Sequence, residues 1–207
     1  MRTKSDASSR RTALLQAALA LFGEKGYPET RVEDVARRAG VAKGTVYLYF
    51  RDKPAICIGL FVWLLQQALA LTAEIDALPL PPRQKLEKLF STWASGVASS
   101  PQVLSLLSME NVNQSNAVMK RFRKQVLPLV RQVQDAIAHI VRQGIRQGEF
   151  RPVDGRAAAT LFLASFHAEL LAGGKLTGRH RPIESVKEIF LHGLLTRPQP
   201  GRGSAGR

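Results

Sequence analysis

The chain has 207 residues, of which 45% are hydrophobic, and its formal net charge is +14. This composition is ordinary for a globular protein and excludes a mainly disordered chain, while the positive charge favours a polyanionic partner. The single cysteine excludes an intramolecular disulfide framework, and the basic N-terminus lacks the apolar segment of a secretory signal. We therefore expect a protein of a reducing cytoplasm.

The first expected elements are a basic arm and one helix. Residues 1–9 are polar and basic, and we expect them to be disordered. From residue 10 to residue 25 apolar side chains recur at helical spacing, which predicts a helix that ends at Gly26, because glycine readily adopts the conformation of a helix C-terminus. This helix would pack across the two helices that follow and hold them together.

Two short helices joined by a tight turn come next. Thr30 and Glu33 have the spacing of a capping box, which predicts that a helix begins at Arg31. Gly40 follows the last apolar residue of that helix, and the next two residues complete a turn of the length found between crossed helices. The second helix would therefore begin near Lys43.

That second helix has an unusual outer face. Val46 and Phe50 lie four residues apart, so both can face the core. The outward set then combines a cation, a glycine, a hydroxyl and two phenols, which suit phosphate oxygens and base edges; the alternative is a surface helix whose tyrosines fold back onto the core. Asp52 can cap the next helix, and Lys53 beside it is placed for a phosphate. The outward set is Lys43, Gly44, Thr45, Tyr47 and Tyr49.

Residues 21–53, LFGEKGYPETRVEDVARRAGVAKGTVYLYFRDK, resemble the N-terminal signature of the tetracycline-repressor-like (TetR) family of bacterial transcription regulators. A glycine-tyrosine turn, a capped helix, the AG turn and a KGTVYLYF segment occur in the family's order. Two positions depart from the pattern, because Ala42 stands where serine is common and Pro54 where an acidic residue is usual. The resemblance implies that bases are read by Thr45 and Tyr47, and that phosphates are held by Lys43, Tyr49 and Lys53. Thr30 fits either a phosphate contact at the start of its helix or capping alone.

The rest of the chain reads as helices. No strand-like alternation occurs, so we expect an all-α protein of about nine helices. A helix-turn-helix DNA-binding domain of three helices would span residues 10–53, and a larger helical bundle would span residues 54–196. Pro128 predicts a kink or a break in a long helical pattern over residues 116–147. Residues 197–207 have the composition of a flexible tail.

The resemblance implies that residues 54–196 form a ligand-binding and dimerisation domain whose last two helices pair with a second copy. A dimer would address a palindromic operator, with the half-site spacing set by the two-fold axis. The residues expected at the dimer interface are Leu161, Ser165, Ile189, Phe190 and Leu194. The alternative for each of the residues that follow, taken singly, is a place in the core of the bundle. The residues expected to line a cavity for a small, apolar effector are Phe61, Trp63, Trp93, Met109, Asn113, Ile137, Phe166 and His167.

Two rival interpretations of the chain differ in class. Residues 54–73 contain no charge and are long enough to span a bilayer, which would make the chain a membrane-associated protein. The polar side chains of Gln66 and Gln67 argue against a membrane span. A helix that is apolar all round also suits the centre of a helical bundle, so the lack of charge has a second explanation. The second rival is a helical-bundle enzyme, but the chain shows no catalytic constellation and no metal spacing among its histidines.

The function expected from the sequence is that of a regulator of transcription. Residues 120–124 hold four basic side chains, which fit either a second nucleic-acid patch or, more commonly, a solvated helix face. We expect a ligand-responsive repressor that is not an enzyme, needs no cofactor or metal, and acts on the nucleoid in a bacterial cytoplasm. Its partners would be double-stranded operator DNA, a second copy of itself and a small apolar effector, with no membrane involved.

Overall fold

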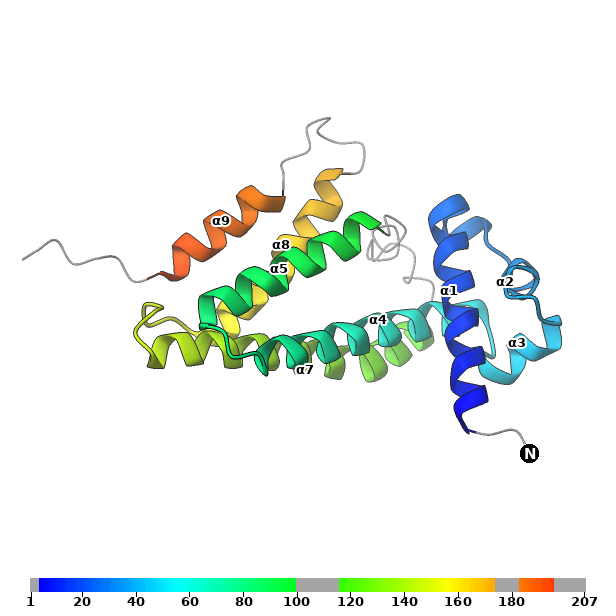
Figure 1. Cartoon of the computed structure of the whole chain (residues 1–207). Coiled ribbons are helices and arrows are strands. Elements are labelled where there is room, and N and C mark those ends of the chain that lie inside the picture. The colour runs from blue at the N-terminus through cyan, green and yellow to red at the C-terminus, as the bar shows by residue number, and fades with distance from the viewer. Residues whose placement is uncertain (1–3, 100–115, 174–182, 196–207) are drawn as a thin grey trace, which may run out of the picture.

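The structure is a computed structural model (Figure 1), and it describes residues 4–99, 116–173 and 183–195. These residues form eight α-helices and, apart from one isolated antiparallel pairing of Phe150 with Leu195, contain no β-structure. The predicted all-α class is confirmed, and the helix count is close to the expected one. The tail expected over residues 197–207 lies outside the described residues.

The first three helices form a unit at one end of the molecule. α2 (Val32–Arg38) and α3 (Lys43–Tyr49) lie against one side of α1 (Lys4–Glu29), as Figure 1 shows. Side chains from all three helices meet in one core, where Leu15 of α1 and Val35 of α2 are fully buried. The predicted helix-turn-helix arrangement is confirmed.

The two ends of α1 differ in how well the sequence predicts them. The helix begins at Lys4, so the prediction of a disordered arm over residues 1–9 is wrong for residues 4–9. Extending an existing helix adds a hydrogen bond for each residue that it orders, and this is far less costly than starting a helix. At the other end Gly26 interrupts the helix as predicted, with φ 82° and ψ 162°, and a last turn runs on to Glu29.

The turn between α2 and α3 depends on Gly40. Its φ of 67° lies in the left-handed region, which residues with a Cβ enter only at a cost. The Gly40 N–H donates to the Arg37 carbonyl at 3.2 Å, and the Val41 N–H donates to the Ala36 carbonyl at 3.0 Å. These bonds close the end of α2, and the chain enters α3 after Ala42, which provides no side-chain cap.

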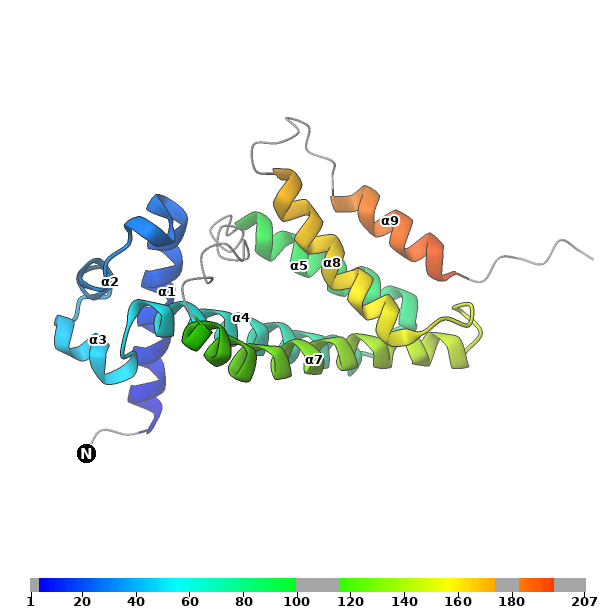
Figure 2. The ribbon, with the colours of Figure 1, turned by 180° about the vertical axis from the view of Figure 1, so that it is seen from behind.

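The larger part of the molecule is built on two long helices. α4 (Lys53–Asp76) and α7 (Asn116–Arg146) run side by side and in the same direction away from the three-helix unit (Figures 1 and 2). α5 (Pro82–Ser99) and α8 (Gly155–Gly173) cross this pair, and α9 (Ile183–Leu194) lies outside them. The bundle predicted to follow the first three helices is therefore present.

α7 is continuous although it contains a proline. The sequence predicts a kink or a break at Pro128, but the helix passes through this position without a break. Proline lacks the N–H that would bond to the carbonyl of Lys124, and this cost is small where water reaches the carbonyl. Position 128 is exposed, so α7 remains one rod of 31 residues.

Buried side chains gather in two clusters. The N-terminal core joins α1, α2 and α3 to the first half of α4 and to the first turns of α7. The C-terminal core joins the second half of α7 to α5, α8, α9 and the end of α4. Packing in the N-terminal core therefore crosses the proposed domain boundary between residues 53 and 54. The α4 and α7 residues in this core include Ile56, Cys57, Leu60, Phe61, Val118, Phe122 and Val126.

A buried lysine ties three helices together at the far end of the bundle. The Lys85 side chain of α5 is only 9% exposed. Its ammonium group donates to the Asp76 carboxylate at 3.1 Å and to the side-chain oxygen of Gln143 at 3.4 Å. Because a buried cation requires partners, these contacts fix the end of α4 and the end of α7 around α5.

The loop after α7 anchors the end of α9. A Cβ on Gly144 would lie 2.1 Å from the Phe150 ring, so only glycine allows this ring to pack against α7. The Phe150 N–H donates to the Gly144 carbonyl at 3.1 Å, and the Arg151 N–H donates to the Leu194 carbonyl at 2.9 Å. The C-terminal end of α9 is therefore fastened to the C-terminal end of α7.

α4 is the uncharged helix that raises the membrane alternative. Among the described residues it is the one helix long and apolar enough to cross a bilayer. Its most apolar stretch of 18 residues has a mean hydropathy of 1.9, and 39% of that stretch is buried within the protein. Its residues 56–61 are all buried in the N-terminal core, whereas Gln66 and Gln67 are exposed. This pattern is that of a helix at the centre of a folded bundle.

Candidate nucleic-acid interface

The orientation of α3 is set by two buried side chains. Val46 is 0% exposed and Phe50 is 4% exposed, so both face the N-terminal core as the sequence predicts. Tyr47 and Leu48 point outward with exposures of 46% and 72%. Tyr49 is only partly exposed and packs against the core, which fits the expected outward position less well. Lys43 and Gly44 are exposed, and Thr45 is partly exposed.

Lys43 is held between two groups. Its ammonium forms an ion pair with the Glu33 carboxylate of α2 and lies 5.9 Å from the centre of the Tyr47 ring. The hydrogen bond between the two side chains lowers the pKa of Glu33 and raises the pKa of Lys43. This exposed ion pair joins the first turn of α3 to α2 and leaves the cation at the surface.

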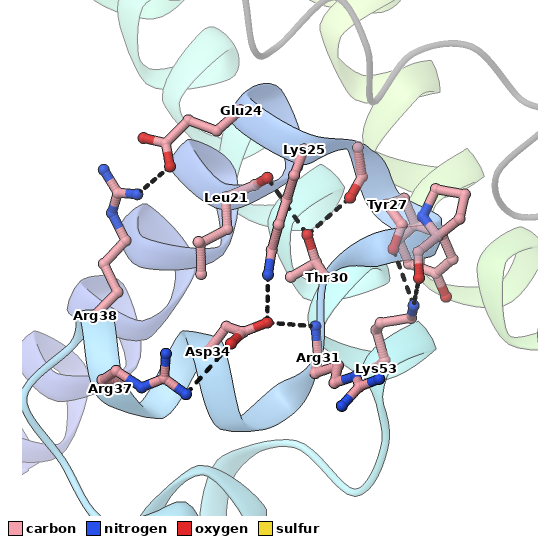
Figure 3. A network of polar contacts seen from close by, with 12 residues as sticks. Leu21, Glu24, Lys25, Tyr27, Thr30, Arg31, Asp34, Arg37, Arg38 and Lys53 are labelled. Atoms are coloured by element: carbon pink, nitrogen blue, oxygen red, sulfur yellow. Dashed lines mark hydrogen bonds and ion pairs between the residues drawn. The ribbon is translucent and has the colours of Figure 1, made fainter.

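The cap of α2 differs from the predicted one (Figure 3). The helix begins at Val32, and the Asp34 carboxylate accepts the Arg31 N–H at 3.1 Å. Hydrogen bonds from Lys25 and from this N–H lower the pKa of Asp34. The predicted capping box of Thr30 with Glu33 is therefore wrong, because a second carboxylate one residue later has the better reach.

Thr30 is a structural residue in this geometry. Its side chain is buried, and its hydroxyl donates to the Gly26 carbonyl at 2.7 Å and to the Leu21 carbonyl at 3.3 Å. These carbonyls lie where Gly26 interrupts α1, so Thr30 satisfies acceptors that the interrupted helix leaves open (Figure 3). The expected contact of Thr30 with a phosphate is not compatible with this position.

Lys53 is also occupied within the protein. Its ammonium donates to the carbonyls of Tyr27 and Pro28 at 2.9 Å and 3.0 Å, and it lies 4.5 Å from the centre of the Tyr27 ring (Figure 3). Partial burial lowers its pKa. Two of its three N–H groups are used in this way, so Lys53 holds the start of α4 against the end of α1 instead of projecting toward a phosphate as predicted.

Two ion pairs fasten α1 to α2, and both appear in Figure 3. Lys25 pairs with Asp34, and Arg38 pairs with Glu24. The hydrogen bond from Arg38 lowers the pKa of Glu24, and the same bond raises the pKa of Arg38. These exposed pairs each contribute little to stability, but together they orient α2 against the supporting helix.

The start of α4 is linked to α7 by a contact that the sequence did not predict. Asp52 caps α4 as expected, because its Oδ1 accepts the Ala55 N–H at 2.6 Å. Nη1 of Arg121 on α7 donates to Oδ2 of Asp52 at 3.1 Å. Next to it, the Phe122 ring meets the Phe61 ring edge-on with centroids 5.3 Å apart. The first turns of α7 therefore contact both the cap and the body of α4.

The other basic residues of this cluster are directed differently. Lys120, Arg123 and Lys124 are exposed on the outer face of α7, whereas the Arg121 side chain is only 21% exposed. The cluster thus divides into a solvated face and one inward-directed cation.

The five residues predicted for a dimer interface line one shallow groove between α8 and α9, about 420 Å³ in volume. Leu161 and Ile189 project from it with exposures of 64% and 74%. Phe190 and Leu194 point inward, since the Phe190 ring lies 5.6 Å from the Phe162 ring and Leu194 is 5% exposed. Ser165 lines the groove and donates to the Phe162 carbonyl at 2.6 Å.

The residues predicted to line an effector cavity are distributed over both cores. Phe61 is buried in the N-terminal core, and Trp63 packs against it. Ile137 is buried in the C-terminal core, and Trp93 packs against that one. The remaining predicted positions lie outside the described residues or have side chains that are not described, namely Met109, Asn113, Phe166 and His167.

The C-terminal core contains an aromatic cluster that joins three helices. The Phe162 ring of α8 meets the Phe90 and Trp93 rings of α5 with centroids 5.0 Å and 5.6 Å apart. Phe190 of α9 joins the same group. Edge-on contacts of this kind hold aromatic rings in fixed orientations, so α5, α8 and α9 are coupled through this cluster.

The described residues contain no group of three or more metal-binding side chains. Cys57 is buried, and this burial raises its pKa to about 12, so its thiol is protonated at neutral pH and is a poor nucleophile. The described part of the chain thus provides neither a metal cluster nor an activated cysteine.

A three-helix unit with an exposed α3 face, joined through α4 to a larger helical bundle, defines the class of helix-turn-helix regulators of transcription. Residues 14–58 match the bacterial regulatory proteins of the tetR family, and residues 82–171 match the tetracyclin repressor-like C-terminal domain. The chain belongs to the tetR family. It is a ligand-responsive, DNA-binding transcriptional regulator.

Individual relatives agree with this assignment. The fatty acid metabolism regulator protein of Bacillus subtilis is 29% identical over 138 residues, which cover 67% of this chain and 69% of the relative. The transcriptional repressor KstR2 of Mycobacterium tuberculosis is 29% identical over 151 residues, which cover 73% and 74%. The crystal structure of FadR from Bacillus subtilis in complex with stearoyl-CoA has the same fold, with a TM-score of 0.71, 24% identity and coverage of 88% and 98%.

Sequence reasoning missed two residues of this region. Leu48 lies among the predicted DNA-facing residues but was passed over, although its spacing from Val46 and Phe50 places it outside the core. Arg121 was grouped with its basic neighbours, and no local signal identifies Asp52 as its partner. Helical periodicity could have found the first residue but not the second.

Proposed function

We propose that this protein is a homodimeric repressor that binds a palindromic operator and is released from it by an effector with an apolar chain. The observation that carries the proposal is the geometry of α3, where Val46 and Phe50 are buried and the opposite face is open. A helix held in this way can enter the major groove and reach base edges. The protein would then act on the nucleoid in a bacterial cytoplasm.

The proposed DNA contacts differ in role. Thr45 and Tyr47 read base edges, while Lys43 and Tyr49 hold phosphates; Gly44 allows the backbone to approach closely, since nothing lies within 4 Å of a Cβ placed there. Lys43 exchanges its Glu33 partner for a phosphate when DNA binds. Thr30 and Lys53 support the interface from within the protein.

The proposed dimer forms through the groove between α8 and α9. Leu161 and Ile189 expose large apolar side chains there, and such side chains on a folded surface indicate a contact with another molecule. A second copy presents the same groove, so a two-fold axis brings the two pairs of helices together. The two α3 helices would then reach successive major grooves of one operator.

For the effector we propose a long-chain acyl thioester. Two observations support this class of ligand. The similar structure of FadR is a complex with stearoyl-CoA. The C-terminal core of this chain is rich in aromatic and aliphatic side chains. A hydrocarbon chain fits such surroundings because it removes apolar surface from water. The effector acts through its different affinities for the DNA-bound and free arrangements of the dimer.

The test begins with the full-length protein and a pool of random duplexes. Bound duplexes are selected and sequenced, and the proposal expects a palindromic consensus. A gel-shift titration then compares the wild type with Tyr47→Ala, which should weaken operator binding while sedimentation still shows a dimer. Leu127→Ala is the matched control, because Leu127 is an exposed apolar residue on α7. Selection of no sequence, or unchanged affinity in Tyr47→Ala, would contradict the proposed interface.

The effector is tested on the same complex. Stearoyl-CoA should release the operator at concentrations where CoA without an acyl chain leaves the complex intact. Release by neither compound, with operator binding unaffected, would reject the acyl thioester while leaving the DNA-binding function standing.

A further inference from the structure

Leu48 is the most exposed large apolar side chain in the three-helix unit, at 72%. Leu161 and Ile189, which are also strongly exposed, share the groove between α8 and α9. Leu48 instead lies on α3, at the opposite end of the molecule (Figure 1), so the proposed dimer does not cover it. Its exposure is unexplained by the contacts within one chain.

The surroundings of Leu48 leave its side chain accessible from one direction. It lies three residues after Thr45 and four after Gly44, so the three positions form one strip along α3. A Cβ added to Gly44 would meet nothing within 4 Å, which shows open space beside the leucine. A partner with a flat surface can therefore approach the backbone at Gly44 closely and contact the Leu48 side chain at the same time.

The charge around this strip favours a polyanion as the partner. Lys43 and Arg51 are exposed at the two ends of α3, and the Arg37 side chain on α2 is 79% exposed; each forms an exposed ion pair with a neighbouring carboxylate, which a phosphate can replace. A second copy of the same face would bring like charges together, whereas DNA would neutralise them. Charge complementarity therefore favours a nucleic acid over a protein contact at Leu48.

We propose that Leu48 reads the methyl group of a thymine in the major groove, and that it is a specificity-determining residue of the operator. This inference rests on the proposed DNA-binding role of α3 and deepens it. The thymine methyl is the apolar group that base pairs display in the major groove. Cytosine lacks this methyl group, so a cytosine at the same place would leave the leucine without its apolar contact. One position in each half-site should therefore favour thymine over cytosine.

The test removes the methyl group and nothing else. Each thymine of the selected operator is replaced singly by deoxyuridine, and equilibrium affinities are measured for the full-length wild type and for Leu48→Ala. In the wild type one symmetry-related substitution in each half-site should weaken binding, by about fourfold for a single buried methyl group. In Leu48→Ala the same substitution should have no effect. Leu127→Ala should respond as the wild type does.

The outcomes separate this inference from the function on which it rests. If no operator is selected, the DNA-binding proposal itself fails. If an operator is bound but no deoxyuridine weakens the wild type, or if Leu48→Ala remains as sensitive as the wild type, the reading of thymine by Leu48 is rejected. If Leu48→Ala does not fold, Leu48→Met serves instead. This variant keeps an apolar side chain, so deoxyuridine at the same thymine should still weaken its binding. If the sensitive thymine of Leu48→Met lies at another position, the inference is overturned.

Discussion

Arg121 and Asp52 are separated by 69 residues in the chain, yet Nη1 of the arginine lies 3.1 Å from Oδ2 of the aspartate. The same carboxylate caps α4 through the Ala55 N–H at 2.6 Å. The Asp52 side chain thus both caps the start of α4 and accepts a hydrogen bond from the Arg121 guanidinium of α7. We infer that a displacement of α7 is transmitted directly to the start of α4, and from there to the three-helix unit.

Replacing Arg121 by alanine should uncouple these helices. We expect the free energy of unfolding to fall by about 1 kcal/mol, since the pair is partly exposed and solvent screens it. A double-mutant cycle with Asp52→Asn, measured by urea unfolding, isolates the interaction. The larger expected effect is on regulation, with operator affinity responding less to the effector. Arg123→Ala on the exposed face should change neither quantity; equal effects of both variants would contradict the coupling.

Lys43 and Lys53 should differ in how their loss changes the salt dependence of binding. Lys43→Ala removes a proposed phosphate contact, so the slope of log affinity against log salt should become shallower by about 0.9. Lys53→Ala should also weaken binding, because the start of α4 loses its hold on Tyr27 and Pro28, but its slope should stay that of the wild type. Operator titrations over a range of salt concentrations measure both. A shallower slope for Lys53→Ala would indicate that Lys53 does contact a phosphate, as the sequence predicts.

The dimer should depend on the exposed side chains of the α8 and α9 groove. Ile189→Asp and Leu161→Asp each place a charge in a contact that would be buried on association, which a dimer does not tolerate without a partner charge. Sedimentation should show monomers of unchanged helix content, and operator affinity should drop because each half-site is bound alone. Leu127→Asp, a charge on the exposed face of α7, should remain dimeric. Dimers of both groove variants would place the interface elsewhere.

Stability should fall at alkaline pH. Burial raises the pKa of Cys57 from 9.0 to about 12 and that of Tyr27 from 10.0 to about 12. Between pH 9.0 and about 12 the unfolded chain therefore loses these protons while the folded chain keeps them, so unfolding becomes more favourable as pH rises. Urea unfolding across this window measures the decline. Cys57→Ala should make it shallower, and an identical decline in this variant would assign the effect to other groups.

Local pattern was sufficient for the elements around α3. The four-residue spacing of Val46 and Phe50 and the position of Gly40 predict the buried face and the turn, because both depend on residues close in sequence. The cap of α2 was misplaced because Glu33 and Asp34 are adjacent carboxylates, and only the final geometry selects between them.

Residues whose partners are distant could not be placed in this way. Lys53 bonds to carbonyls 25 and 26 residues away, at a kink in α1 whose direction the sequence does not specify. Arg121 has its partner even farther away. Lys53 was assigned to a phosphate and Arg121 to a solvated face or a second nucleic-acid patch, although carbonyls and a carboxylate of the protein itself are their partners.

The continuity of α7 through Pro128 makes this helix a long lever. Its 31 residues span about 46 Å, from the turns that hold Asp52 to the end that is fastened to α9. For the far end of such a rod to move by the rise of one base pair, about 3.4 Å, the rod needs to tilt by only about 4°. A tilt of this size about the end near α9 would therefore carry the first turns of α7, with their contact to Asp52, through one base-pair step.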